Sequence, residues 1–411
     1  MHRLQGKLGA YKDEGRRMKA ESVDKHRSTS CGISLRLMML VIPLMAAQAR
    51  CVELPTYPTR YYIIHTDLDR DGVREAVMRM THMAEEYRRR TSDFAGTIDR
   101  RMDFYLFKNH GDYLATGAPK GSAGYFDGTK LVALAGDLGP RTWHTVQHEG
   151  FHQFARFMIR GDMPAWLNEG LAEYFAEGAF TGDEFITGLI PQARLDRIQK
   201  ALKQEQFKPI NDLMSLSLDE WNSQLAVLNY DQGWTLVQFL AHGENAKYQP
   251  QFQHFIGGIG NELPWEFAWR QELGDPKEIE TPWRDYWANL PANPTVDLYA
   301  QANVSTLASF FGRALARGQR FADFGQFLLA ARQKKLQSDP AEWLPPSLLS
   351  DALEQQAKLS SHGFEYAIER RPGEARPQIA CKLPDGRKAV GRFTVAGGKL
   401  TVKSEILPKG K

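Results

Sequence analysis

The segment Thr145–Phe157, TVQHEGFHQFARF, places two histidines four residues apart in a run that otherwise resembles a buried helix. Positions four apart lie on one face of a helix, with about 5–6 Å between their Cβ atoms. The imidazoles of His148 and His152 can therefore both reach one zinc ion, at about 2.0–2.1 Å. Glu149 can act on a metal-bound water without binding the metal itself. This spacing predicts a helical zinc site.

A second predicted helix, in MPAWLNEGLAEYFAEG, offers a third ligand. Pro164 is a favourable first-turn residue, and Glu169 and Glu173 share one face of the helix that follows. In an isolated helix these acids would be expected to face water. A catalytic zinc usually takes three protein ligands, however, and the two-histidine site upstream lacks one. We therefore expect Glu169 to complete the site, and Gly170 to let the two helices approach closely.

The motifs HEGFH at 148–152 and WLNEG at 166–170 together resemble the gluzincin metallopeptidases, such as thermolysin and the zinc aminopeptidases of the leukotriene-hydrolase type. The chain is most similar to uncharacterised, exported bacterial members of that clan, and the resemblance covers about residues 61–290. It implies a zincin-like catalytic domain. By position it also implies that the zinc ligands are His148, His152 and Glu169.

The same resemblance implies three further roles. Glu149 would be the general base, and Glu173, one turn after Glu169, would orient a ligating histidine. The segment NYDQGWTLVQFL is similar to the Tyr-x-x-Gly helix start of the aminopeptidases, whose tyrosine stabilises the oxyanion. Tyr230 takes that position, and a core or capping tyrosine is the alternative.

The chain departs from these families in three places. Sixteen residues separate His152 from Glu169, slightly fewer than in the aminopeptidases. The segment GSAGYFDG lacks the glutamate that grips the free amine of an aminopeptidase substrate, although an edge strand that hydrogen-bonds the substrate backbone can remain. The distal catalytic histidine of thermolysin has no clear counterpart, and His242 and His254 are candidates by elimination.

These residues predict zinc-dependent hydrolysis of peptide bonds in a peptide or protein substrate, with a metal-bound water activated by Glu149. One alternative is a catalytically inactive zincin-fold protein that binds peptides or an envelope polymer, although the intact Glu149 argues against it. Another is a zinc hydrolase of a non-peptide amide or ester. The net charge of +3 comes without a long basic stripe, so we expect no nucleic-acid partner.

The N-terminus predicts export. Arg36 precedes the apolar run Leu37–Ala47, which is too short to span a bilayer and ends in a small-x-small cleavage site. We expect a signal segment cleaved after Ala49, a periplasmic or secreted protein, and no stable membrane span after cleavage; an N-terminal anchor or buried helix is the alternative. Cys51 and Cys381 would remain and could pair in an oxidising compartment.

The expected fold class is α+β. Strand and helix patterns alternate before residue 140, giving a small mixed N-terminal sheet lobe that ends in two short strands around Asp127–Gly128. A mainly helical lobe follows to about Leu290, then a helical segment and a small antiparallel β module. The expected domains are a leader (1–49), a metallopeptidase domain (50–292), a helical segment (293–350) and a β-rich module (351–411).

Overall fold

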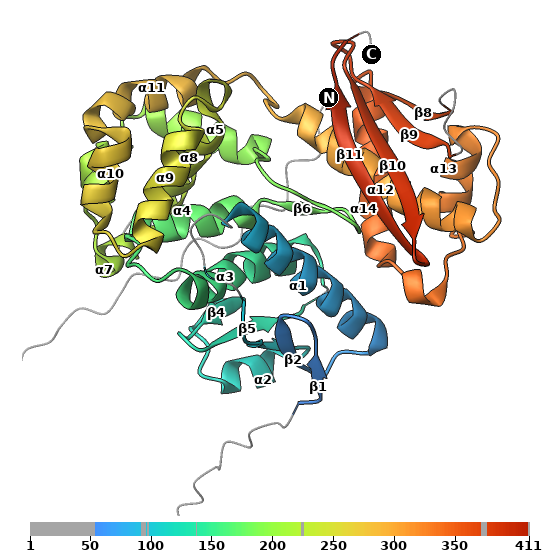
Figure 1. Cartoon of the computed structure of the whole chain (residues 1–411), viewed down its shortest axis with the longest axis horizontal. Helices are drawn as coiled ribbons and strands as arrows, with labels where there is room; N and C mark the ends of the chain where they lie inside the picture. Colours follow the sequence, from blue (N-terminus) through green and yellow to red (C-terminus); the bar gives the residue numbers. More distant parts are fainter. Residues whose placement is uncertain are drawn as a thin grey trace, which may run out of the picture. The chain divides into compact units, whose positions relative to one another are not determined.

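The computed structural model describes residues 54–409, apart from 92–95, 97, 137, 223–225 and 371–375. The expected leader, its cleavage site after Ala49 and Cys51 lie outside the described residues. The described chain is an α+β protein with a sheet near each end and helices between them, as the sequence predicted (Figure 1).

The N-terminal sheet has five strands in the order β1-β2-β3-β5-β4. Its inner strands β2, β3 and β5 are parallel, whereas β1 and β4 run antiparallel at the two edges. The helix α1, Arg70–Arg90, connects β2 to β3. The expected turn at Gly128 is present, with φ at 93°, and it places β4 at the edge. The strands are β1 Thr56–Pro58, β2 Tyr62–Thr66, β3 Met102–Phe107, β4 Gly124–Phe126 and β5 Lys130–Leu134.

Nine helices of the middle segment pack with this sheet around one hydrophobic core. Six tryptophans of that core are fully buried: Trp166, Trp221, Trp234, Trp269, Trp283 and Trp287. The helices are α3 Pro140–Met158, α4 Ala165–Ala176, α5 Gln192–Lys203, α6 Ile210–Met214, α7 Leu218–Trp221, α8 Ala226–Ala246, α9 Gln249–Gly260, α10 Trp265–Leu273 and α11 Pro276–Asn289. Backbone angles leave the helical region at Gly243, so the regular part of α8 ends at His242.

Gly170 allows a close helix crossing, but not the one that the sequence suggested. A Cβ atom at Gly170 would lie 2.6 Å from the carbonyl oxygen of Gly233, which is on α8. The expectation that Gly170 brings α3 and α4 together was therefore wrong, because the glycine faces α8 instead. A sequence shows that a helix has a small residue on one face, but not which neighbour that face meets. The crossing brings the first turns of α8, with Tyr230, close to α4.

A short hairpin interrupts the helical segment. Strands β6, Ala179–Phe180, and β7, Phe185–Ile186, pair antiparallel across a turn in which Gly182 has φ at 101°. The sequence predicted mostly helix here, because two-residue strands are too short to show an alternating pattern. Figure 1 shows β6 extending toward the C-terminal elements. In the turn, the Thr181 hydroxyl lies 2.9 Å from that of Ser305 in α12.

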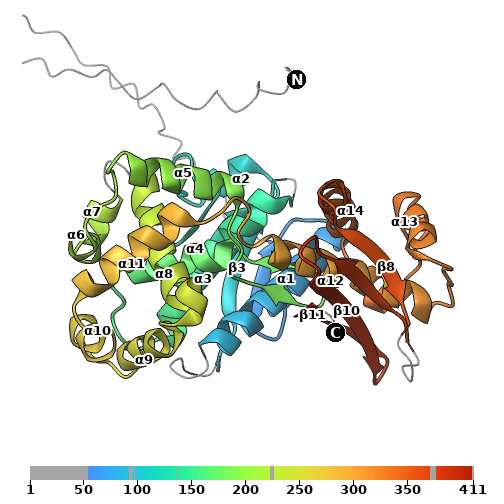
Figure 2. The same ribbon diagram turned by 90° about the horizontal axis from the view of Figure 1, so that it is seen from above.

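The C-terminal elements share a second core. Helix α12 lies along a four-stranded antiparallel sheet of order β11-β10-β9-β8 (Figure 2). The expected boundary between a helical segment and a β module, at 350/351, falls inside α14. We therefore describe residues 296–407 as one C-terminal lobe. Its elements are α12 Val296–Ala316, α13 Phe324–Arg332, α14 Pro346–Ser361, β8 Glu365–Glu369, β9 Gln378–Lys382, β10 Lys388–Ala396 and β11 Lys399–Leu407.

Cys381 is a free thiol in the interior of this lobe, and burial raises its pKa to about 12. Its expected partner, Cys51, is not among the described residues. No helix in the described ranges is both long and apolar enough to cross a bilayer.

Candidate metal centre

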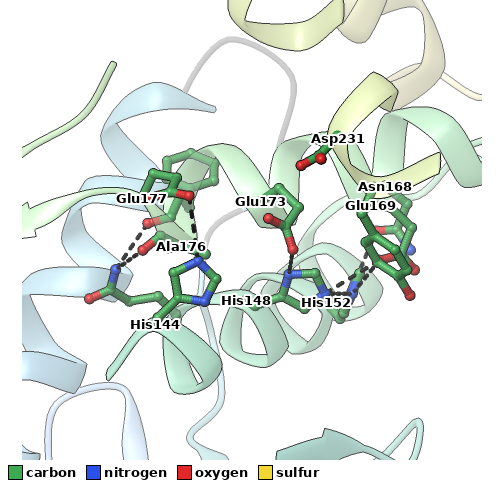
Figure 3. Close-up of polar contacts among 12 residues, drawn as sticks. His144, His148, His152, Asn168, Glu169, Glu173, Ala176, Glu177 and Asp231 are labelled. Atoms are coloured by element: carbon green, nitrogen blue, oxygen red, sulfur yellow. Dashed lines mark hydrogen bonds and ion pairs between the residues drawn. The ribbon is translucent and has the colours of Figure 1, made fainter. Parts of the chain in front are cut away.

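Three side chains from two helices converge on one point (Figure 3). His148 and His152 project from the same face of α3, and Glu169 projects from α4, which packs across it. The Oε2 atom of Glu169 lies 3.3 Å from Nε2 of His148 and 3.4 Å from Nε2 of His152. The two Nε2 atoms are 3.1 Å apart. We call these residues the His–His–Glu cluster, and its donor atoms could hold a metal ion.

The burial of Glu169 favours a positive charge beside its carboxylate. The residue is 6% exposed, and its Oε2 atom has no hydrogen-bond partner among the described residues. A buried acceptor in that state costs about 1–3 kcal/mol. Burial would raise the pKa of Glu169, but the two neighbouring imidazoles outweigh it and lower the pKa to about 2. The carboxylate is therefore held in its charged form, facing both Nε2 atoms.

The opposite nitrogen of each imidazole is also held in place. Nδ1 of His148 lies 3.1 Å from Oε1 of Glu173, and Nδ1 of His152 lies 3.2 Å from Oδ1 of Asn168. Burial lowers the pKa of His148, but the carboxylates of Glu169 and Glu173 outweigh that effect and raise it to about 10. In the absence of a metal, the imidazole of His148 therefore carries a proton on both nitrogens. The partners at Nδ1 fix the ring orientation, so a bound metal would replace only the proton on Nε2.

Glu173 belongs to a buried charge cluster that sequence analysis missed. The side chain of Arg194, from α5, is 6% exposed. Its guanidinium donates to Oε2 of Glu173 at 2.6 Å, to Oε1 of Glu177 at 2.8 Å and to Oδ1 of Asp231 at 3.0 Å. Burial opposes the charge of Glu173, but Arg194 and His148 hold its pKa well below the usual range. We call Arg194, Glu173, Glu177 and Asp231 the Arg194 cluster.

The sequence contains one weak signal of this cluster. Arg194 and Arg197 lie three residues apart on α5, and both contact Asp231, which directly follows Tyr230. The spacing shows that the two arginines share a face, but the acids that they meet come from α4 and α8. Only the tertiary packing brings these groups together.

A second set of possible ligands lies one helical turn before the His–His–Glu cluster. It consists of His144, Glu173 and Glu177, and Nε2 of His144 lies 3.7 Å from Oε1 of Glu177. The guanidinium of Arg194 already bonds both carboxylates, so a positive charge is present there. Of the two groups, the His–His–Glu cluster, which has no arginine beside it among the described residues, is the better candidate for a metal position.

The His–His–Glu cluster opens into a cavity of about 350 Å³. Glu149, His152 and Glu169 line this cavity together with Phe126 of the edge strand β4. Glu149 is half-buried, and it lines the cavity next to two residues of the cluster. This is the placement expected for a group that acts on a molecule held next to a metal.

Tyr230 lies beside His148 of the cluster. Its ring centre is 6.0 Å from that of His148, and its hydroxyl donates to Oδ1 of Asn222 at 3.1 Å. Burial and the charges of Glu169 and Glu149 raise the pKa of Tyr230, so the hydroxyl keeps its proton. The ring is thus near the cluster, and the hydroxyl proton is engaged by Asn222.

The two histidines proposed by elimination lie elsewhere. Nε2 of His242 is 2.9 Å from the hydroxyl of Tyr174, and burial lowers the pKa of His242 to about 4, with help from Arg90. The side chain of His254 is 72% exposed and lies near Glu272. Neither histidine contacts the His–His–Glu cluster, and the structure gives neither a place in the site.

Comparison with known proteins gives one family match, to a family whose activity is not described. A family described as "protein of unknown function (DUF1570)" matches residues 142–258. This range runs from α3 into α9 and contains the His–His–Glu cluster, Glu149, Tyr230 and the Arg194 cluster. No curated protein matches the chain, and no solved structure matches it.

Proposed function

We propose that the protein is a zincin-type metallopeptidase that hydrolyses peptide bonds with one zinc ion in the His–His–Glu cluster. The observation that carries the proposal is the buried Oε2 atom of Glu169, which faces two Nε2 atoms and has no hydrogen-bond partner among the described residues. Glu149 lines the same cavity, in the position of a base. The motif spacing, with its resemblance to gluzincins, supports the same reading.

The donor set fits zinc. Zinc in proteins binds nitrogen and carboxylate oxygen at about 2.0–2.2 Å in a tetrahedral arrangement, so two ligand atoms of one ion lie about 3.3–3.4 Å apart. The three donor separations in the cluster are 3.1, 3.3 and 3.4 Å. His148, His152 and Glu169 would thus hold the ion, next to the cavity that His152 and Glu169 line. Three protein ligands and one open position are typical of catalytic zinc.

The chain's own residues then divide the work of hydrolysis. When bound, zinc would acidify a water molecule and polarise the scissile carbonyl. Glu149 takes the proton of the attacking water and delivers it to the leaving amine. Tyr230 exchanges its bond to Asn222 for one to the oxygen of the substrate, where negative charge develops. Glu173 and Asn168 hold the two imidazoles in place throughout.

The position of β4 supports a peptide as the substrate. This strand is at the edge of the sheet, and Phe126 at its end lines the cavity. A Cβ atom at Gly124 would lie 2.6 Å from Cγ2 of Thr145, so the strand packs closely on α3. An extended peptide can add to such an edge through backbone hydrogen bonds, which would place it beside Glu149.

Purified protein that has not met a chelator tests the proposal. We expect one zinc per chain and cleavage of a peptide library that stops when zinc is removed. Glu149→Gln should retain zinc and lose turnover, whereas Glu354→Gln, at an exposed position on α14, should retain both. Protein without zinc would contradict the metal assignment. Zinc without peptide cleavage would favour the binding-protein or non-peptide hydrolase alternatives.

A further inference from the structure

Two arginines line the same cavity as the proposed catalytic residues. Arg156 lies four residues after His152, on the same face of α3, and Arg160 follows just beyond the end of that helix. Both side chains are exposed, so their guanidinium groups stand at the solvent side of the cavity. Four residues of a helix rise about 6 Å, which separates the backbone of Arg156 from that of His152 along α3.

Most other arginines in the described part of residues 54–290 have a bonding partner, and these two do not. Arg79, Arg90 and Arg284 each bond a carboxylate of their own helix. Within the described ranges, neither Arg156 nor Arg160 forms an ion pair, a side-chain hydrogen bond or a ring contact. Three acidic side chains, Glu149, Asp162 and Glu169, line the same cavity, but none of them forms an ion pair with either arginine. Both guanidinium groups are therefore available for an anion.

We propose that Arg156 and Arg160 form a subsite for a carboxylate of the substrate, close to the bond that is cleaved. The inference rests on the proposed peptidase function and adds the class of peptide. A guanidinium matches a carboxylate in shape and binds it through two parallel hydrogen bonds. An extended residue spans about 3.3–3.6 Å, so the carboxylate lies about one or two residues from the scissile bond.

The rest of the cavity wall specifies the neighbouring side chain. Phe126, Ala155, Ile159, Met163 and Leu218 line it and supply apolar surface. The preferred peptide therefore combines an apolar residue with a nearby carboxylate. The segment 121–128 also lacks a glutamate for a free amine. Neither arginine can bind an amine, so the two side chains add no support for aminopeptidase specificity.

Matched peptides test the subsite in the zinc-loaded full chain. One pair differs by Glu against Gln within two residues of the scissile bond, and a second pair differs by a free against an amidated C-terminus. We expect kcat/KM to favour the carboxylate member of at least one pair by about tenfold, and the preference to shrink as salt rises. The pair that shows it identifies the side chain or the C-terminus as the source.

The variants locate the effect. Arg156→Gln and Arg160→Gln should each reduce the ratio within the preferred pair, and the double variant should bring it near one. Arg101→Gln, at an exposed arginine of the same lobe outside the cavity lining, should leave the ratio unchanged. Zinc content is measured in every variant. Equal cleavage of both members of both pairs would overturn the subsite and leave the peptidase proposal intact.

Binding provides a readout that does not depend on turnover. Zinc-loaded Glu149→Gln protein should bind the labelled carboxylate peptide about tenfold more tightly than its neutral partner, by fluorescence polarisation, and the double arginine variant should not discriminate. This result supports the subsite even if no peptide is cleaved, in which case the peptidase proposal alone fails. Equal affinities would overturn the subsite in either case.

Discussion

Each lobe of the described chain buries an arginine among carboxylates, and the two sites differ in what surrounds them. The side chain of Arg194 is 6% exposed and that of Arg313 is 7% exposed. Arg313 bonds Asp183 through two nitrogens and pairs with Glu342 at 3.2 Å. Its remaining hydrogen bonds go to backbone carbonyls of Ser309 and Glu342. All the hydrogen bonds that Arg313 donates therefore end at groups of the protein.

The Arg194 cluster continues to a histidine. One carboxylate oxygen of Glu173 accepts a hydrogen bond from Arg194, and the other lies 3.1 Å from Nδ1 of His148. The chain of contacts ends at Oε2 of Glu169, which has no hydrogen-bond partner in the described part of the chain. Burial of charge is therefore common to a structural and a candidate functional site. The distinguishing feature is an unsatisfied atom beside a cavity.

The largest expected effect comes from removing the two arginines in turn. Arg194→Met and Arg313→Met should each lower the free energy of unfolding by about 3–5 kcal/mol, because each leaves buried carboxylates without a cation. Only Arg194→Met should also weaken zinc binding, by about 10–100-fold, because Glu173 loses the group that holds it. Urea unfolding and competition with a chelator measure the two quantities.

Equal zinc affinity in both arginine variants would break the comparison, because the Arg194 cluster would then be purely structural. If Arg194→Met does not fold, Arg194→Lys retains a charge but cannot reach three carboxylates at once. The same chelator competition on that variant then decides the question.

A tyrosine near the His–His–Glu cluster and one in the C-terminal lobe allow the same comparison by enzyme kinetics. Tyr230 and Tyr366 each donate a hydroxyl hydrogen bond to an asparagine oxygen, of Asn222 and Asn303 respectively. Tyr230→Phe should lower kcat by about 10²–10³ and leave KM nearly unchanged, since the proposed bond forms only in the transition state. Tyr366→Phe should cost only stability, about 1–3 kcal/mol. Steady-state kinetics and melting temperatures on the same preparations separate these outcomes; a kcat for Tyr230→Phe within a few-fold of the native value removes Tyr230 from the site.

A buried histidine outside the cluster provides a test by pH. Burial lowers the pKa of His242 to about 4, from an ordinary value near 6.5. Between these values the unfolded chain binds a proton that the folded chain does not, so stability is present above about pH 6.5 and falls as the pH drops toward 4. The full difference is about 3 kcal/mol. His242→Gln should flatten this part of the stability curve measured by urea unfolding, and a variant curve as steep as the native one would contradict the lowered pKa.

The smallest effects are expected from two glycines at close crossings. A Cβ atom at Gly170 would lie 2.6 Å from the oxygen of Gly233, and one at Gly391 would lie 2.8 Å from Cβ of Ala308. Gly170→Ala and Gly391→Ala should each cost about 1–3 kcal/mol. Zinc affinity should fall only for Gly170→Ala, and only a few-fold, because Glu169 is the preceding residue. A Gly170→Ala protein as stable as the native chain would show that α4 and α8 can separate without cost.

Sequence reasoning succeeded where the relevant contacts are local. A spacing of four residues fixes two histidines on one helical face, and the Asp127–Gly128 pair fixes a hairpin, whatever packs around them. Glu169 could be named because the two-histidine pattern demands a third ligand. Arg194 and the neighbour of Gly170 could not be named, because they depend on how separate helices cross. The β6–β7 hairpin was missed because its strands are too short to produce a period.

That hairpin determines where the protein can be shortened. Asp183 and Glu184 in its turn meet Arg313, Ser305 and Ser404, all of which belong to the C-terminal lobe. A recombinant fragment that stops at Leu290 would keep both carboxylates and lose every one of these partners. The matched range 142–258 contains both carboxylates but none of these partners, so a fragment of that range would leave the two carboxylates without them.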